Sequence, residues 1–310
     1  MVLEVHEEAE PLTLTAASTR FSVRLRQETG RVRFPHVYEI KSPDEELTKI
    51  HPPNFCLLHG GGFCNRTMSW VEFGQGAGDI IFIKVTRHDG VPFPRTTRIL
   101  PYSASVRVDS FADGGRTIFF AVRGAHRHLL LHHGDAPSRE PSSSFRHLLM
   151  IWVGGLDPSP ASLDPHRTLR FGPGVHRLEG AGILQLPRHI DTVVLARGAW
   201  VEGRFNVTPS ERPNTPLRML GHGIMDGSRF TYHGTHAADS MRFVEPQYDR
   251  PLVWDGPSLI NPQGHAAVLP PHSRARAFRM LGWLYNEDGI CTRRWAHMTA
   301  ASSQPHNLSC

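Results

Sequence analysis

The sequence predicts an all-β protein in which an N-terminal β-sandwich is followed by a parallel β-solenoid. Glycine and proline are frequent and scattered, with 28 and 25 copies in 310 residues, and this favours short strands joined by turns. In the first half, alternating apolar and polar runs recur at roughly ten-residue intervals, as in a β-sandwich. In the second half, 24 residues separate the equivalent Gly203 and Gly227 of a repeat, a period typical of stacked solenoid coils.

The composition is that of a globular protein, with 39% hydrophobic and 20% charged residues. Arginine carries the formal net charge of +5, because only three residues are lysine. These charges are dispersed along the chain, so we expect neither nucleic acid nor a membrane as a partner. The first ten residues are acidic and lack the apolar run of a signal peptide, and no stretch is long and apolar enough to span a membrane.

The cysteines and histidines do not form a recognisable metal site. Cys56, Cys64, Cys291 and Cys310 include no C-x-x-C pair, so we expect neither a zinc site nor a redox motif. A Cys56–Cys64 disulfide and two free thiols both remain open. Histidines gather between residues 126 and 133, but the chain contains 20 of them and such clustering is expected by chance. We therefore predict no metal and no cofactor.

Residues 1–160 are predicted to form the β-sandwich, with a loop insertion near residues 42–68. FSVRLR, from Phe21, and VYEI, from Val37, alternate apolar and polar residues as half-buried strands do. The inserted stretch is polar and rich in proline and glycine, which are loop residues. Further strands are expected at residues 70–73, 80–85, 105–108, 117–122 and 129–131. Residues 157–165 are rich in proline and serine and mark the domain boundary.

Residues 165–292 are predicted to form a partial solenoid in which each coil buries its apolar face on the next. LARGAWVEGRF, from Leu195, and LGHGIMDGSRF, from Leu220, are two copies of one repeat. The candidate coils are residues 182–186, 193–205, 217–230, 257–269 and 278–292. A longer step of 37 residues from Gly227 to Gly264 is explained by a loop inserted within residues 231–255. We expect residues 293–310 to be an unstructured tail.

Two features of the repeat resemble catalytic groups. Glu202 and Asp226 occupy equivalent repeat positions, so we expect them to stack, but their place before a glycine favours turn chemistry over a catalytic pair. The segment Gly221-His222-Gly223 is interpreted as the corner of a coil.

The motifs SW-x-x-F, ILP-x-S, FGPGVH, LARGAWVEG, GHGIMDGSRF and GWLYNEDGI occur in this order between Trp70 and Ile290. Together they resemble the right-handed parallel β-helix glycoside hydrolases. The sequence is similar to the dextranase/isopullulanase family 49 and to the polygalacturonase-like family 28 with an N-terminal β-sandwich. The resemblance implies a pectin-lyase-like solenoid and inverting hydrolysis of dextran, another α-glucan or polygalacturonan by aspartate carboxylates, without a cofactor. It also implies a secreted protein, and we expect a monomer.

The resemblance also implies individual site residues. Asn286-Glu287-Asp288-Gly289 matches the N-T-D-G segment of these families with glutamate in place of threonine, so Asp288 is the expected catalytic residue and Asn286 a substrate-binding one. His265 is expected to face the same groove if a 25-residue step from Gly264 to Gly289 holds. Trp254 is expected to stack on a sugar ring.

The Asp-Asp pair that supplies the remaining catalytic carboxylates in these families is absent. After Ile290 the chain reads CTRRWAHMTAASSQPHNLSC, which contains no acidic residue. We therefore expect a C-terminally truncated relative with weak or no activity. The alternatives are a carbohydrate-binding protein without catalysis and an unstable fragment without function.

Overall fold

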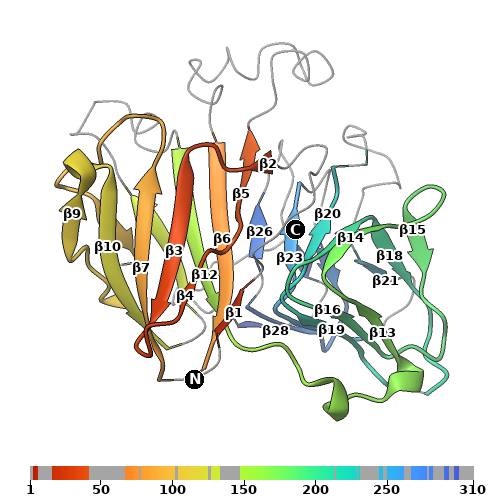
Figure 1. The fold of residues 1–310 in the computed structure, drawn as a ribbon. Helices are drawn as coiled ribbons and strands as arrows, with labels where there is room; N and C mark the ends of the chain where they lie inside the picture. The colour runs from red at the N-terminus through yellow and green to blue at the C-terminus, as the bar shows by residue number, and fades with distance from the viewer. Residues whose placement is uncertain are drawn as a thin grey trace, which may run out of the picture. The chain divides into compact units, whose positions relative to one another are not determined.

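A computed structural model describes residues 3–5, 16–41, 67–76, 78–101, 104–124, 127–132, 147–212, 214–228, 230, 244–246, 250–261, 267–277, 279–281, 290–292 and 297–299. Within these residues the chain is all-β and contains parallel sheets, as predicted (Figure 1). It divides into two compact units, Met1–Leu156 (unit 1) and Asp157–Cys310 (unit 2). Helical structure in the described residues consists of the 3-10 turns η3 (Asp113–Gly115), η5 (Pro160–Ser162) and η6 (Pro165–Arg167). None of it is long and apolar enough to cross a bilayer.

Unit 1 contains a seven-stranded and a five-stranded sheet. The seven-stranded sheet has the order β2 (Ala16–Ala17), β5 (Val37–Lys41), β6 (Thr67–Gln75), β12 (His147–Gly154), β11 (Arg127–His132) and β8 (Arg98–Leu100), with β1 (Leu3–Val5) also paired to β6. The five-stranded sheet has the order β4 (Val32–Arg33), β3 (Phe21–Gln27), β7 (Ile80–Arg87), β10 (Thr117–Arg123) and β9 (Ser110–Ala112).

The two sheets of unit 1 share one hydrophobic core. In β3, every second residue from Phe21 is buried and the residues between are exposed, because successive side chains of a strand point to opposite faces. Val71 of β6, Ile83 of β7 and Ile151 of β12 lie in the same cluster as Phe21. Residues 42–66 connect the antiparallel neighbours β5 and β6 and lie outside the described residues. The predicted insertion near residues 42–68 therefore falls between two adjacent strands, except that residues 67 and 68 already belong to β6.

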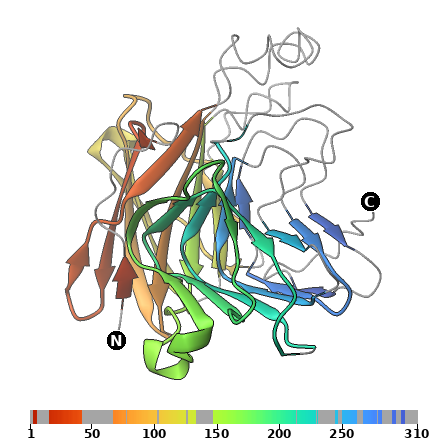
Figure 2. The same ribbon diagram turned by 90° about the vertical axis from the view of Figure 1, so that its right-hand side faces the viewer.

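Unit 2 is built from three parallel sheets (Figure 2). The first solenoid sheet contains β13 (Thr168–Phe171), β16 (Thr192–Leu195), β19 (Leu217–Gly221), β22 (Leu252–Asp255), β25 (Arg274–Arg276) and β28 (His297–Thr299). The second contains β14 (Gly174–Arg177), β17 (Ala199–Glu202), β20 (Ile224–Asp226), β23 (Ser258–Ile260) and β26 (Arg279–Leu281). The third contains β15 (Ile183–Gln185), β18 (Arg204–Val207), β21 (Val244–Pro246), β24 (Ala267–Leu269) and β27 (Ile290–Thr292). Each coil therefore gives one strand to each sheet.

The apolar residues of successive coils form one core inside unit 2. Leu195, Val201, Phe205, Met219 and Met225 belong to one buried cluster although they come from different coils. Adjacent strands of a sheet lie about 4.8 Å apart, so equivalent side chains of neighbouring coils touch. No coil buries this surface alone, as the repeat predicted.

The coil-to-coil register confirms the first repeat and corrects later parts of the prediction. Glu202 is paired with Asp226, 24 residues later. In the third sheet, however, Ala267 is paired with Ile290, 23 residues later, so the 25-residue step taken from glycine spacing is wrong. Residues 231–255, which were expected to contain an inserted loop, also include the strands β21 and β22. Residues 231–243 of this stretch lie outside the described residues. The tail expected to be unstructured includes β28, which pairs with β25.

A buried arginine ties together the chain segments that enter the first solenoid sheet. Arg250 Nη2 donates to Asp191 Oδ1 at 2.6 Å and Arg250 Nε donates to the Thr215 carbonyl at 3.1 Å. Arg167 and Ser210 also bind the Asp191 carboxylate. Burial alone would raise the pKa of Asp191, but the hydrogen bonds from Ser210 and Arg167 and the charges of both arginines lower it below its ordinary value.

We expect Arg250→Met to destabilise unit 2 by about 3 kcal/mol at pH 7, because it leaves a buried carboxylate without one of its cations. A carboxylate whose pKa is lower in the folded than in the unfolded protein stabilises the fold at pH values above its unfolded pKa of about 3.9. This stabilisation is lost as the pH falls below that value. The wild type should therefore lose more stability than Arg250→Met between pH 5 and pH 3, as read from urea unfolding curves. Arg218→Met, at an exposed position of β19, is the control and should change little. Equal acid sensitivity of wild type and Arg250→Met would contradict the expectation.

Candidate functional site

One row of the second solenoid sheet brings an arginine and two carboxyl groups together. Arg177 of β14, Glu202 of β17 and Asp226 of β20 are partners in successive strands. Each ends its strand, and Gly203 and Gly227 follow the two acids. Arg177 Nε donates to Glu202 Oε2 at 3.0 Å. The pairing of repeat positions predicted from the sequence is therefore present in space.

Asp226 has a different environment from Glu202. Its Oδ2 accepts a hydrogen bond from Trp200 Nε1 at 3.2 Å, and its Oδ1 accepts from the Ser228 amide at 2.9 Å and from Asn261 Nδ2 at 3.3 Å. Burial raises the pKa of Asp226 above its ordinary value, and the hydrogen bonds from Ser228, Asn261 and Trp200 only partly offset this rise. Two neighbouring carboxyls in unlike surroundings resemble the acid and base of a hydrolase.

The accessibility of these carboxyls favours a structural role over a catalytic one. Asp226 is 2% exposed and Glu202 is 7% exposed, so neither presents a free edge to a polymer arriving from solvent. Both oxygens of Asp226 already accept hydrogen bonds, and the bond from the amide two residues ahead is that of an Asx turn. The row thus holds the corner between the second and third sheets, as the preference for turn chemistry predicted.

The Gly221-His222-Gly223 segment is also a coil corner. Gly221 ends β19 with a φ of 100°, and a Cβ placed on it would lie 2.1 Å from the Leu195 carbonyl oxygen. A Cβ on Gly223 would lie 2.7 Å from the Leu195 Cβ. His222 is buried beside Arg279, with 3.5 Å between its Nδ1 and the Arg279 Nη2. The glycines are therefore required by the close stacking of coils.

The predicted catalytic segment lies just before a described strand. Asp288, Asn286 and His265 fall outside the described residues, so their roles stay predictions. The strands that follow them, β24 and β27, are adjacent parallel neighbours in the third solenoid sheet.

Trp254 lies in the core of unit 2 and not on a surface. Its side chain has 0% exposure, and its Nε1 donates to the Pro257 carbonyl at 2.9 Å. In β22 it alternates with the less buried Val253 and Asp255, and the inward position explains its burial. A fully buried indole offers no face to a sugar ring, so the sugar-stacking role expected for Trp254 is replaced by a core role.

We expect Trp254→Phe to lower the free energy of unfolding by about 1–2 kcal/mol, because it removes a buried hydrogen bond and part of the packed ring. Polysaccharide affinity should not change. Urea unfolding and affinity electrophoresis in dextran gels measure the two quantities on the same preparation. A loss of dextran affinity without loss of stability would contradict the core assignment.

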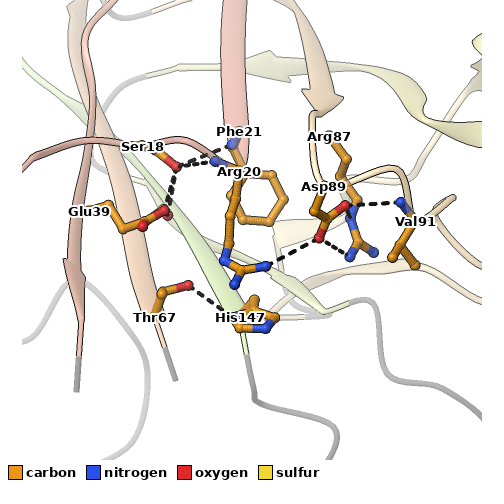
Figure 3. A network of polar contacts seen from close by, with 10 residues as sticks. Ser18, Arg20, Phe21, Glu39, Thr67, Arg87, Asp89, Val91 and His147 are labelled. Atoms are coloured by element: carbon orange, nitrogen blue, oxygen red, sulfur yellow. Dashed lines mark hydrogen bonds and ion pairs between the residues drawn. The ribbon is translucent and has the colours of Figure 1, made fainter. Parts of the chain in front are cut away.

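Polar networks in unit 1 hold turns and strand ends (Figure 3). The buried Glu39 accepts hydrogen bonds from Ser18 Oγ at 2.8 Å and from Ser69 Oγ at 3.3 Å. Asp89 accepts from Arg87 Nη2 at 2.6 Å and from the Val91 amide at 3.1 Å. Burial alone would raise the pKa of Asp89, but these bonds and the charges of Arg87 and Arg20 lower it. Glu39 and Asp89 therefore both serve to join segments of unit 1.

A basic and aromatic surface on the five-stranded sheet was not expected from the sequence. A cavity of about 390 Å³ is lined there by Arg24, Arg26, Phe82, Lys84 and Phe119, among others. The sequence did contain an indication of this surface. In the alternating strands FSVRLR and IIFIKV, the positions that point outward hold Arg24, Arg26, Lys84 and Phe82. Among the described residues, no group of three or more histidine, cysteine or acidic side chains is arranged to hold a metal ion.

Comparison with known proteins shows the fold. No protein family matches the sequence, and no curated protein is similar to it in sequence. Among solved structures, Dex49A from Penicillium minioluteum, a family 49 dextranase, matches with a TM-score of 0.64 and 17% sequence identity. The match covers 93% of this chain and 65% of that chain, so the protein described here spans slightly less than two thirds of the other's length. The likeness shows that the chain shares the fold of this dextranase.

Proposed function

We propose that this chain is a polysaccharide hydrolase of low activity in which unit 1 is a β-sandwich, unit 2 is a right-handed parallel β-helix, and Asp288 is the catalytic acid. The activity is low because residues 291–310 contain no acidic residue that could supply the remaining carboxylates. Two observations carry the proposal: the likeness to a dextranase extends over 93% of the chain, and the Asn286–Gly289 motif directly precedes β27 of the third solenoid sheet. Fold alone does not define an activity, so the assignment depends on this motif together with the fold.

The register of the third sheet supports a shared groove. Ala267 and Ile290 are partners in adjacent coils, and His265 and Asp288 each stand two residues before one of them in the sequence. The proposal places these two side chains at equivalent points of neighbouring coils, about 4.8 Å apart along the sheet. His265 and Asn286 would then hydrogen-bond sugar hydroxyls on either side of the acid.

The chemistry follows from the needs of glycoside cleavage. The Asp288 carboxylic acid protonates the glycosidic oxygen, so the leaving sugar departs as a neutral alcohol. Water then adds to the anomeric carbon from the opposite face, which inverts the configuration. The proton that this water loses passes to the solvent, because no second carboxylate is assigned as its base. This reaction needs a proton donor and water but no redox or group-transfer cofactor.

The substrate we propose is dextran or a related α-glucan, on the strength of the likeness to a dextranase. Purified protein should release reducing ends from dextran faster than from pullulan or polygalacturonate at equal mass of polymer. Heat-denatured protein controls for contaminating sugar. Release from polygalacturonate alone would overturn the substrate assignment, and release from none of the three would overturn the hydrolase assignment.

A further inference from the structure

The outer face of the five-stranded sheet in unit 1 presents cations in register on neighbouring strands. Arg24 of β3 pairs with Lys84 of β7, and Arg26 pairs with Phe82. Lys84 also pairs with Phe119 of β10. These positions alternate with buried core residues, so all five side chains point away from the core. The three strands lie side by side in Figure 1.

Aromatic rings hold the cations of this face. The Arg26 guanidinium carbon lies 5.0 Å from the centre of the Phe82 ring, and Lys84 Nζ lies 5.9 Å from the centre of the Phe119 ring. Phe82 is 37% exposed, so the pair that it forms with Arg26 lies at the surface. Among the described residues, no carboxylate pairs with Arg24, Arg26 or Lys84. The charges are thus fixed in place and directed to solvent.

The basic surface continues around the edge strand β9. The first cavity, of about 390 Å³, is lined by Ser110 of β9 and contains a single acidic lining residue, Asp109. A second cavity of about the same volume, lined by Phe111, Arg95 and Arg107, lies on the other face of β9. Arg95 again lies over a ring, 4.6 Å from the centre of Phe111. On the outer face alone, cations on the neighbouring strands β3 and β7 suit an extended anionic chain better than a small ion.

We propose that this face binds an acidic polysaccharide whose sugars carry carboxylates. Arginine binds a carboxylate through two parallel hydrogen bonds, so Arg24 and Arg26 suit this group. Single-stranded nucleic acid is bound where bases stack on open aromatic faces, whereas the rings of Phe82 and Phe119 are covered by Arg26 and Lys84. The site belongs to unit 1, whereas Asp288 belongs to unit 2, and it would attach the protein to an anionic polymer without cleaving it.

The test compares polygalacturonate with its fully methyl-esterified form, which has the same backbone without the charges. Full-length protein is measured by biolayer interferometry at low and at physiological salt, with Asp288→Asn as the background so that no ligand is cleaved. The site variant is R24Q/R26Q/K84Q. The charge-matched control is R170Q/R188Q/R218Q, which removes three exposed arginines of unit 2. Thermal melting of both variants checks that unit 1 remains folded.

We expect polygalacturonate to bind at least about tenfold more weakly to the site variant than to the parent, because three exposed ion pairs are lost. The control variant should bind within about twofold of the parent, and affinity should fall with salt. The proposal is overturned if the methyl ester binds as well as the acid, if both triple variants lose affinity equally, or if single-stranded DNA binds the face more tightly than polygalacturonate. Dextran hydrolysis is measured separately, so its absence does not bear on this site.

Discussion

Substitution of Gly221 by alanine is expected to lower the free energy of unfolding of unit 2 by about 4 kcal/mol or more, which places it among the most damaging single changes. The added Cβ would lie 2.1 Å from the Leu195 carbonyl oxygen and 2.9 Å from its carbon. These are backbone atoms of the preceding coil, so no rotamer change relieves the overlap. The φ of 100° at Gly221 adds strain, because residues with a side chain rarely adopt this backbone angle.

The same close approach recurs one coil later. A Cβ on Gly256, with a φ of 105°, would lie 2.1 Å from the Gly221 carbonyl oxygen. Gly174 is the matched control, since its φ is 116° but nothing lies within 4 Å of the added Cβ. Gly174→Ala should therefore cost only about 1–3 kcal/mol from backbone strain. Urea unfolding of the three variants separates strain from coil contact, and equal losses at Gly174 and Gly221 would contradict the stacking account.

Asp288→Asn is expected to reduce the rate of reducing-end release from dextran by at least about 100-fold, within the range that a general acid contributes. The amide keeps the shape of the side chain and loses the transferable proton, so dextran binding should be retained. The measurement is the steady-state rate with dextran, with kcat and KM determined separately. A fall in affinity with an unchanged kcat would assign Asp288 to binding and not to proton transfer.

Asp255→Asn is the matched control for this variant. Asp255 is an aspartate of the first solenoid sheet whose side chain is 38% exposed and lies 3.4 Å from Arg276 Nε. Its replacement by asparagine should leave the rate within about twofold of wild type. A large loss at Asp255 would show that the assay responds to solenoid stability.

Local periodicity was sufficient to predict several strands and the first repeat. It failed at residues 105–108, which were expected to form a strand and do not, and it did not indicate β8 or β12. Phe21–Gln27 alternates in burial as the sequence indicates, because a strand with one face on a core must alternate. Glu202 and Asp226 are partners because two successive coils keep the same length.

Coil length, the direction of Trp254 and the strand β28 depend on tertiary packing and could not be predicted from local periodicity. Glycine spacing predicted a 25-residue step, but the paired residues Ala267 and Ile290 are 23 residues apart. The two lengths differ because a solenoid coil can lengthen or shorten at its turns while its strands stay in register. The direction of Trp254 depends on its strand register, which the surrounding turns obscure. The strand β28 is only three residues long and is defined by pairing with β25, a contact distant in sequence.

The configuration of the first sugar product tests the central claim most directly. Proton NMR recorded during early hydrolysis of an α-linked dextran oligosaccharide distinguishes the two anomers before they interconvert. Inversion at the anomeric carbon predicts that the β-anomer appears first and that the α-anomer follows only by mutarotation. Initial formation of the α-anomer would contradict the account.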